Sequence, residues 1–147
     1  MHPLLRHKHA DDDLKSIVSR YKAATGSERK RLKSAIGRIV FILEAMAEDE
    51  GFQDRLLIDD KSDENGAVNF RKWIAQHRLG NDLWRVKLWQ GPDLVKFRII
   101  YAYQKIDPFN HLAKFHVLAI VDRDKFNYEG EHESDISARI INDYRSL

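Results

Sequence analysis

Hydrophobic residues recur at helical spacing through the first third of the chain. The first run extends from Asp11 to Thr25, and its apolar residues lie three and four positions apart: Leu14, Ile17, Val18 and Tyr21. This spacing forms one face of an amphipathic helix. Gly26 ends the helix, and Ser27 is the predicted N-cap of a longer second helix that ends near Gly51. We therefore expect a helical hairpin.

Three later segments have the pattern of β-strands: residues 83–88, 97–103 and 115–121. In the first segment, apolar side chains alternate with Arg85 and Lys87, so the strand has one apolar face and one cationic face. The second segment repeats this arrangement with Arg98 on the polar side. Turn residues separate the segments, which predicts an antiparallel meander.

The remaining segments have weaker patterns. Residues 52–82 contain a polar loop at 59–66, and Val68 to Arg78 is predicted as a short helix. We expect 52–82 to be an insertion that forms an excursion on the surface. A last helix is predicted from about Ser134, and its buried stripe consists of Ile136, Ile140, Ile141 and Tyr144.

These elements predict an α+β fold: an N-terminal helical hairpin packed on a small antiparallel β-sheet, with a C-terminal helix. A length of 147 residues fits a single domain over residues 1–147. We expect the hairpin to cover one face of the sheet and the other face to stay open. The open face is then the one that carries Arg85, Lys87 and Arg98.

Composition narrows the chemistry that the chain can perform. The absence of cysteine excludes a disulfide framework, a thiol nucleophile and a cysteine-type zinc site, and a reducing cytosol is the expected compartment. No apolar run approaches the length of a membrane span. The net charge is only +2, but residues 71–128 contain eleven Lys and Arg against five Asp and Glu. A local excess of this kind is typical of a basic binding face.

Cations on neighbouring strands of one face would converge on an anion, and phosphate is the anion that they suit best. Arg123 and Tyr128 follow the third strand, and Trp89 is a candidate for stacking on a base. Alternatives stay open for these residues: the first-strand pair fits a solvated sheet face, Arg123 could pair with Asp122 or Asp124, and Tyr128 could pack against the terminal helix.

The histidines give no clear metal-site pattern. His7 and His9 are two residues apart near one end of the chain, which predicts no more than adventitious metal binding. His111 and His116 lie near the third strand, where a structural role is expected. The sequence therefore predicts no metal ligands and no cofactor.

The segment from 83 to 128 resembles the RelE/ParE superfamily of toxins from bacterial and archaeal toxin–antitoxin systems. The resemblance rests on three motifs in order: an aromatic-basic-apolar-basic strand at 83–88, an aromatic-Arg strand at 97–101, and a final strand with its Arg and nearby Tyr at 117–128. The flanking helices fit the family's order of elements. The family also has a strand ahead of the helices, for which Leu4 to His9 is the candidate.

The RelE branch of this superfamily cuts mRNA in the ribosomal decoding site without a metal. The resemblance implies an endoribonuclease toxin that inhibits translation, with Lys87, Arg98, Arg123 and Tyr128 as catalytic residues. It implies RNA-binding roles for Arg85, Lys87 and Trp89. His132 joins them because some RNA-cleaving relatives use a histidine near the tyrosine.

The resemblance also implies partners. The first is a cognate antitoxin that covers the basic face, and the second is the ribosome with its mRNA. The expected compartment is the cytoplasm, with no membrane partner. Association into a small homo-oligomer is left as an open alternative. The ParE branch shares the fold, lacks nuclease activity and inhibits DNA gyrase. A non-enzymatic toxin of that kind is therefore the alternative function.

Overall fold

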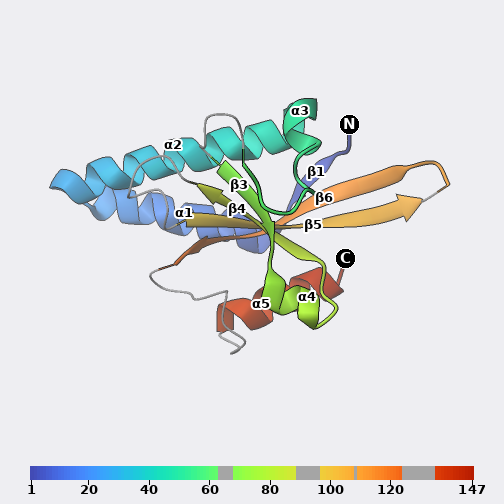
Figure 1. Ribbon diagram of the computed structural model, residues 1–147. Helices are drawn as coiled ribbons and strands as arrows, with labels where there is room; N and C mark the ends of the chain where they lie inside the picture. The colour runs from blue at the N-terminus through green and yellow to red at the C-terminus, as the bar shows by residue number, and fades with distance from the viewer. Residues whose placement is uncertain (63–67, 89–96, 108, 124–134) are drawn as a thin grey trace.

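A computed structural model describes residues 1–62, 68–88, 97–107, 109–123 and 135–147 (Figure 1). The strands are β1 (Leu4–Arg6), β2 (Lys61–Ser62), β3 (Val68–Lys72), β4 (Leu83–Leu88), β5 (Phe97–Asp107) and β6 (Leu112–Asp122). The helices are α1 (Lys8–Ala23), α2 (Gly26–Glu48), α3 (Glu50–Gln53), α4 (Ile74–Arg78) and α5 (Asp135–Arg145). The strands form one sheet in the order β1-β6-β5-β4-β3-β2.

The two longest strands, β5 and β6, lie next to each other in the sheet. β4, β5 and β6 form the predicted antiparallel meander, and β3 and β2 continue it on the far side of β4. β1 adds to the other side and is parallel to β6, with Leu4 opposite Phe115 and Arg6 opposite Val117. β1 therefore lies where a strand ahead of the helices was expected.

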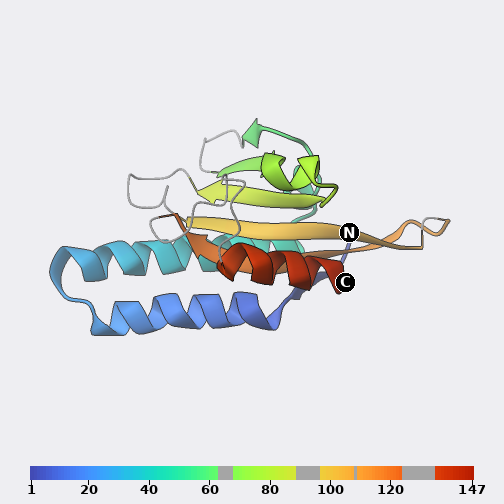
Figure 2. The same cartoon turned by 90° about the horizontal axis from the view of Figure 1, so that it is seen from below.

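Helices α1 and α2 lie side by side on one face of the sheet (Figure 2). Gly26 has φ +60°, a left-handed conformation that glycine adopts without strain, and it begins α2 directly after the N-cap Thr25. The predicted start of this helix at Ser27 was therefore slightly late. The face beneath is apolar because alternate side chains of β4, β5 and β6 point toward the helices, among them Val86, Ile99 and Val117.

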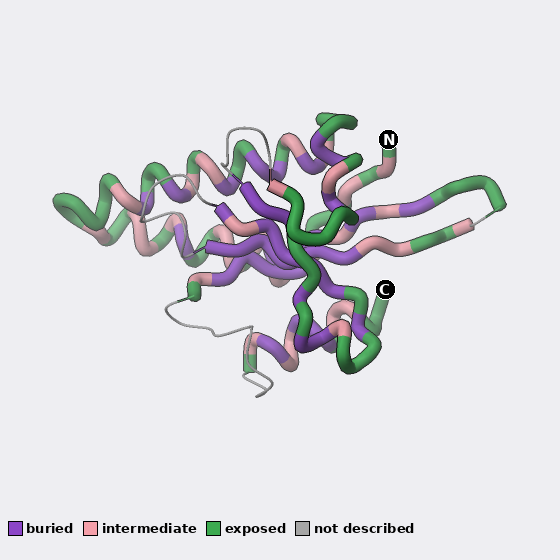
Figure 3. The backbone as a smooth tube through the Cα atoms, in the orientation of Figure 1, coloured by how far each residue is buried: buried purple, intermediate pink, exposed green. Residues whose placement is uncertain are grey.

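The opposite face is not open, which corrects the expectation from sequence. Helices α4 and α5 lie on this side of the sheet (Figure 1). Ile140 of α5 shares a second buried cluster with Trp73, Leu83, Ile100 and Leu118. Figure 3 accordingly shows buried residues through the middle of the sheet. Because helices lie on both faces, the core has two layers.

The segment 52–82 is more than a surface excursion. Residues 68–72 form β3 rather than a helix, because Val68 and Phe70 alternate with polar residues and point into the core under α2 and α3. Only residues 74–78 are helical, as α4. The α+β class is confirmed, but the prediction of a helical hairpin packed on a small sheet was wrong in detail. Within the described residues the sheet has six strands, and two of them come from this segment.

The outer edge of β6 is completed by a side chain. β1 covers the edge only from Phe115 to Val117. Beyond it, the backbone N–H of Ile120 donates to Asp13 Oδ2 of α1 at 3.0 Å. Arg139 of α5 donates to both oxygens of the same carboxylate, at 2.9 and 2.8 Å. Asp13 therefore ties α1, β6 and α5 together around the edge of the sheet.

Among the helices of the described ranges, none combines the length and apolar character that spanning a lipid bilayer requires.

The substitution Asp13→Ala should destabilise the chain by about 1–3 kcal/mol, because it leaves a partly buried guanidinium and an edge N–H without their acceptor. Chemical denaturation measures the change. Asp12→Ala is the matched control, since Asp12 is exposed in the same turn of α1 and carries the same change in helix propensity. Equal destabilisation by the two substitutions would contradict the role given to Asp13.

Candidate nucleic-acid interface

The sheet brings three of the predicted cations onto one face. Lys87 of β4 lies directly opposite Arg98 of β5, and Arg85 lies opposite Ile100. Side chains of directly opposite residues share a face, and so do residues two apart on one strand. Arg85, Lys87 and Arg98 therefore lie on the side of the sheet that α4 and α5 also occupy, away from α1 and α2.

β3 adds two polar residues that sequence reasoning missed. Asn69 lies opposite Lys87, and Arg71 lies opposite Arg85. Both therefore belong to the same face. The polar-apolar alternation of residues 68–71 is the signal that could have found them, but a helix was predicted there instead.

The cations of this face differ sharply in exposure. Arg98 has 0% and Arg85 has 5% of its surface exposed. Lys87 is half-buried, whereas Arg71 and Arg123 are exposed. An anion in solvent can therefore contact the side chains of Lys87, Arg71 and Arg123. The buried guanidinium groups of Arg85 and Arg98 act on it through their electric field.

Arg85 is held by a short polar network that starts on β3. Its Nη1 donates to Asn69 Oδ1 at 3.0 Å and to the Asn69 carbonyl oxygen at 3.3 Å. The amide nitrogen of Asn69 in turn donates to Asp60 Oδ1 and to Ser62 Oγ, both at 3.2 Å. Asn69 is itself buried, so its orientation is fixed by partners on both sides. The network holds the guanidinium of Arg85 against the sheet.

Arg98 and Arg123 lie at the same end of the sheet. Arg98 Nη1 donates to the Phe97 carbonyl oxygen at 2.9 Å, and its neighbour across the strand pair is Val121. Arg123 follows two residues later, just past the end of β6. Asp122, a suggested partner of Arg123, has its carboxylate 3.0 Å from Arg20 Nη1 of α1. That ion pair draws Asp122 toward the helices on the other face.

Three predicted site residues, Trp89, Tyr128 and His132, lie outside the described residues, as does Asp124. Their roles stay predictions. The structure therefore positions Arg85, Lys87, Arg98 and Arg123 of the predicted set and adds Asn69 and Arg71.

Tyr101 is a fully buried tyrosine of β5, but it belongs to the opposite face of the sheet from these cations. Its hydroxyl donates to the Leu56 carbonyl oxygen. Burial raises the pKa of Tyr101 well above its ordinary value, an effect that the charge of Arg85 partly offsets. A phenol with a raised pKa is a poor proton acceptor, so Tyr101 is a packing residue of the core.

His116 has the structural role that its position predicted. Its ring shares a 2.8 Å hydrogen bond between Nε2 and Gln104 Oε1 across the β5–β6 pair. Burial lowers the pKa of His116, and the nearby charges of Lys114 and His7 lower it further. The folded chain therefore favours the neutral imidazole.

Comparisons with known proteins identify no relative: no family model, no curated protein and no solved structure matches this chain.

Asn69→Ala should destabilise the fold by about 1–3 kcal/mol, because it removes an acceptor from a buried guanidinium. Equilibrium denaturation in urea gives the difference. Asn142→Ala removes the same side chain from an exposed position on α5 and serves as the control. If both variants unfold at the parent's urea concentration, the Asn69 network does not hold Arg85 in place.

Stability should fall as the pH drops below about 6.5, because the unfolded chain then binds a proton at His116 that the folded chain resists. The loss continues down to the lowered pKa of the folded state and is complete below it. His116→Gln removes this contribution, so its unfolding free energy should change less between pH 7.5 and pH 5 than that of the parent. Parallel pH curves for the two proteins would refute this assignment.

Proposed function

We propose that this chain is a RelE-like toxin: a metal-independent endoribonuclease that cleaves mRNA on the ribosome and thereby inhibits translation. The observation that carries the proposal is the cross-strand placement of Lys87 beside Arg98, with Arg85 on the same face. Arg123 follows at the same end of the sheet. An RNA phosphate is the anion that such a set of cations suits best.

The order of elements supports the same proposal. β1, α1 and α2 precede the antiparallel strands β4, β5 and β6, and α5 follows them. This is the order that the resemblance of residues 83–128 to the RelE/ParE superfamily implies. β2, β3 and α4 come from the inserted segment, and β3 supplies Asn69 and Arg71 to the cationic face.

The proposed reaction is an attack of the RNA 2′-oxygen on the adjacent phosphorus, with departure of the 5′-oxygen. The products are a 2′,3′-cyclic phosphate and a 5′-hydroxyl. The reaction needs an acceptor for the 2′-hydroxyl proton, positive charge near the phosphorane, and a proton for the leaving oxygen. Nearby cations lower the pKa of a phenol, so Tyr128 is the proposed acceptor.

Exposure divides the cations between two proposed roles. Lys87 and Arg123 have accessible surface and would contact the phosphate, with Lys87 protonating the leaving oxygen and Arg123 stabilising the negative charge. Arg85 and Arg98 are buried and would add positive potential from within the sheet, where low polarity strengthens their field. Trp89 and His132 keep the RNA-contacting roles that the sequence suggests. A cognate antitoxin would inhibit the toxin by covering this face.

One observation favours the second candidate, a ParE-like inhibitor of DNA gyrase without nuclease activity. Arg98 has no exposed surface, and Arg85 is hydrogen-bonded to Asn69. Both arginines would then serve only to stabilise the sheet, and the inhibitory surface would lie elsewhere.

Induced expression in bacteria separates the two functions when mRNA 5′ ends and gyrase-linked DNA breaks are mapped in the same cultures. The proposal predicts cuts at a fixed position within codons and no gyrase-linked breaks. In a purified translation system, Lys87→Met and Arg123→Ala should slow cleavage by about 10²-fold. Tyr128→Phe should slow it by about 10²–10⁴-fold.

Each variant has a control that makes the same change at a residue outside the candidate site. Lys105→Met, Arg145→Ala and Tyr103→Phe should cleave at the parent's rate. Full cleavage by all three site variants would sink the nuclease assignment. Gyrase-linked breaks without mRNA cuts would establish the alternative.

A further inference from the structure

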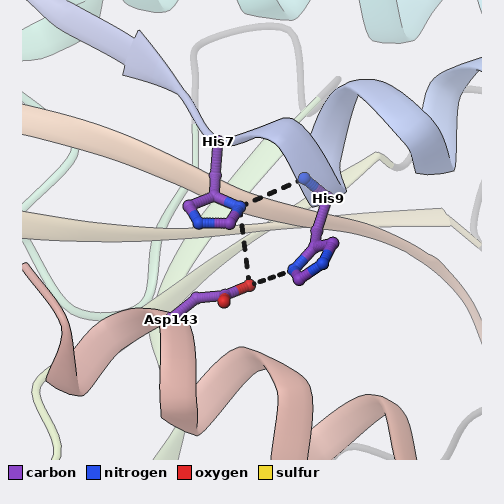
Figure 4. A group of neighbouring side chains, drawn as sticks. All are labelled: His7, His9 and Asp143. Carbon is purple, nitrogen blue, oxygen red and sulfur yellow. Dashed lines mark hydrogen bonds and ion pairs between the residues drawn. The ribbon is translucent and has the colours of Figure 1, made fainter.

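Two histidines near the start of the chain meet an aspartate near its end. His7 is the N-cap of α1, His9 lies in the first turn of α1, and Asp143 lies near the end of α5. His9 Nδ1 is 2.7 Å and His7 Nδ1 is 3.5 Å from Asp143 Oδ2. Figure 4 shows the three side chains pointing toward one another between the two helices.

We propose that His7, His9 and Asp143 form a binding site for Zn²⁺ that joins α1 to α5. Each residue can offer one ligand atom, and the three atoms lie within 4.8 Å of one another. Two imidazole nitrogens and one carboxylate oxygen are a donor set that Zn²⁺ binds readily. A water molecule would complete a tetrahedral coordination.

The two distances to Asp143 require only small adjustments. Ligand bonds of about 2.0–2.2 Å in a tetrahedral site place neighbouring ligand atoms about 3.3 Å apart. The separation of His7 and Asp143 already fits, whereas the hydrogen bond between His9 and Asp143 must open by roughly half an ångström. His7 Nδ1 also accepts the His9 backbone N–H at 3.1 Å, so coordination through this atom would replace the helix cap.

Charge and exposure favour a cation at this position. The side chains of His7 and His9 are 33% and 40% exposed, so an ion can enter from solvent, while Asp143 is only 12% exposed. The last turn of α5 carries partial negative charge, which adds to that of the carboxylate. The N-terminus of α1 has the opposite polarity, and the anionic ligand offsets it. The ion would fasten α5 to the start of α1.

The proposal is tested by adding Zn²⁺ to the full chain purified without an affinity tag, since a histidine tag would itself bind the metal. Zn²⁺ should raise the thermal unfolding midpoint, because it binds the folded chain in preference to the unfolded one. Co²⁺ should give the visible absorption of a tetrahedral site. Competition with a chromogenic chelator measures the affinity for Zn²⁺.

Asp143→Asn and His9→Gln should each weaken Zn²⁺ binding by at least about tenfold. His111→Asn is the control and should bind as the parent does, because it removes an exposed histidine outside the cluster at a left-handed position that asparagine tolerates. Circular dichroism without metal establishes that the variants fold. If Asp143→Asn does not fold, the Zn²⁺ affinity of His9→Gln tests the proposal. The proposal is overturned if the parent shows no Zn²⁺-dependent shift, or if the folded ligand variants bind as tightly as the parent.

Discussion

The burial of two charged guanidinium groups on one face of the sheet is the constraint on which the rest of this structure depends. Arginine stays protonated under all ordinary conditions, so Arg85 and Arg98 remain charged although almost no water reaches them. The sheet must therefore supply acceptors. For Arg85, they come from Asn69 on β3, a strand of segment 52–82 that pairs with β4. Segment 52–82 is thus part of what makes the cationic face stable.

The same constraint shapes the proposed function. A buried cation that the fold already stabilises needs no reorganisation when a phosphate arrives, whereas an exposed side chain must be ordered by it. Two adjacent strands combine both kinds of group, because the buried Arg85 and Arg98 share a face with the half-buried Lys87. This arrangement fits the binding and cleavage of RNA, and it also explains how a sheet can carry positive charge on a face that helices partly cover.

Regular patterns made most of the fold predictable from sequence. The periodicity of α1, α2 and α5 extends over several turns, and the alternation in β4 and β5 marks the face with Arg85, Lys87 and Arg98. Short-range patterns failed at β3, because five residues followed directly by a helical turn do not distinguish a strand from a helix. The place of Asn69 on the cationic face was missed for the same reason. The cluster of His7, His9 and Asp143 could not be predicted either, since packing of α5 against the rest of the chain joins residues 134 or more positions apart.

The central claim is that the face with Lys87 and Arg98 receives an RNA phosphate, and photo-crosslinking tests it most directly. A short mRNA that carries a photoreactive uridine in the decoding site of a stalled ribosome would be incubated with the full chain. Cleavage is blocked by 2′-O-methylation of the same nucleotide. The account predicts crosslinks at the accessible side chains of this face, Arg71, Lys87 and Arg123, and at Trp89 and Tyr128. Crosslinks confined to α1 and α2, or none above the level obtained with free RNA, would contradict it.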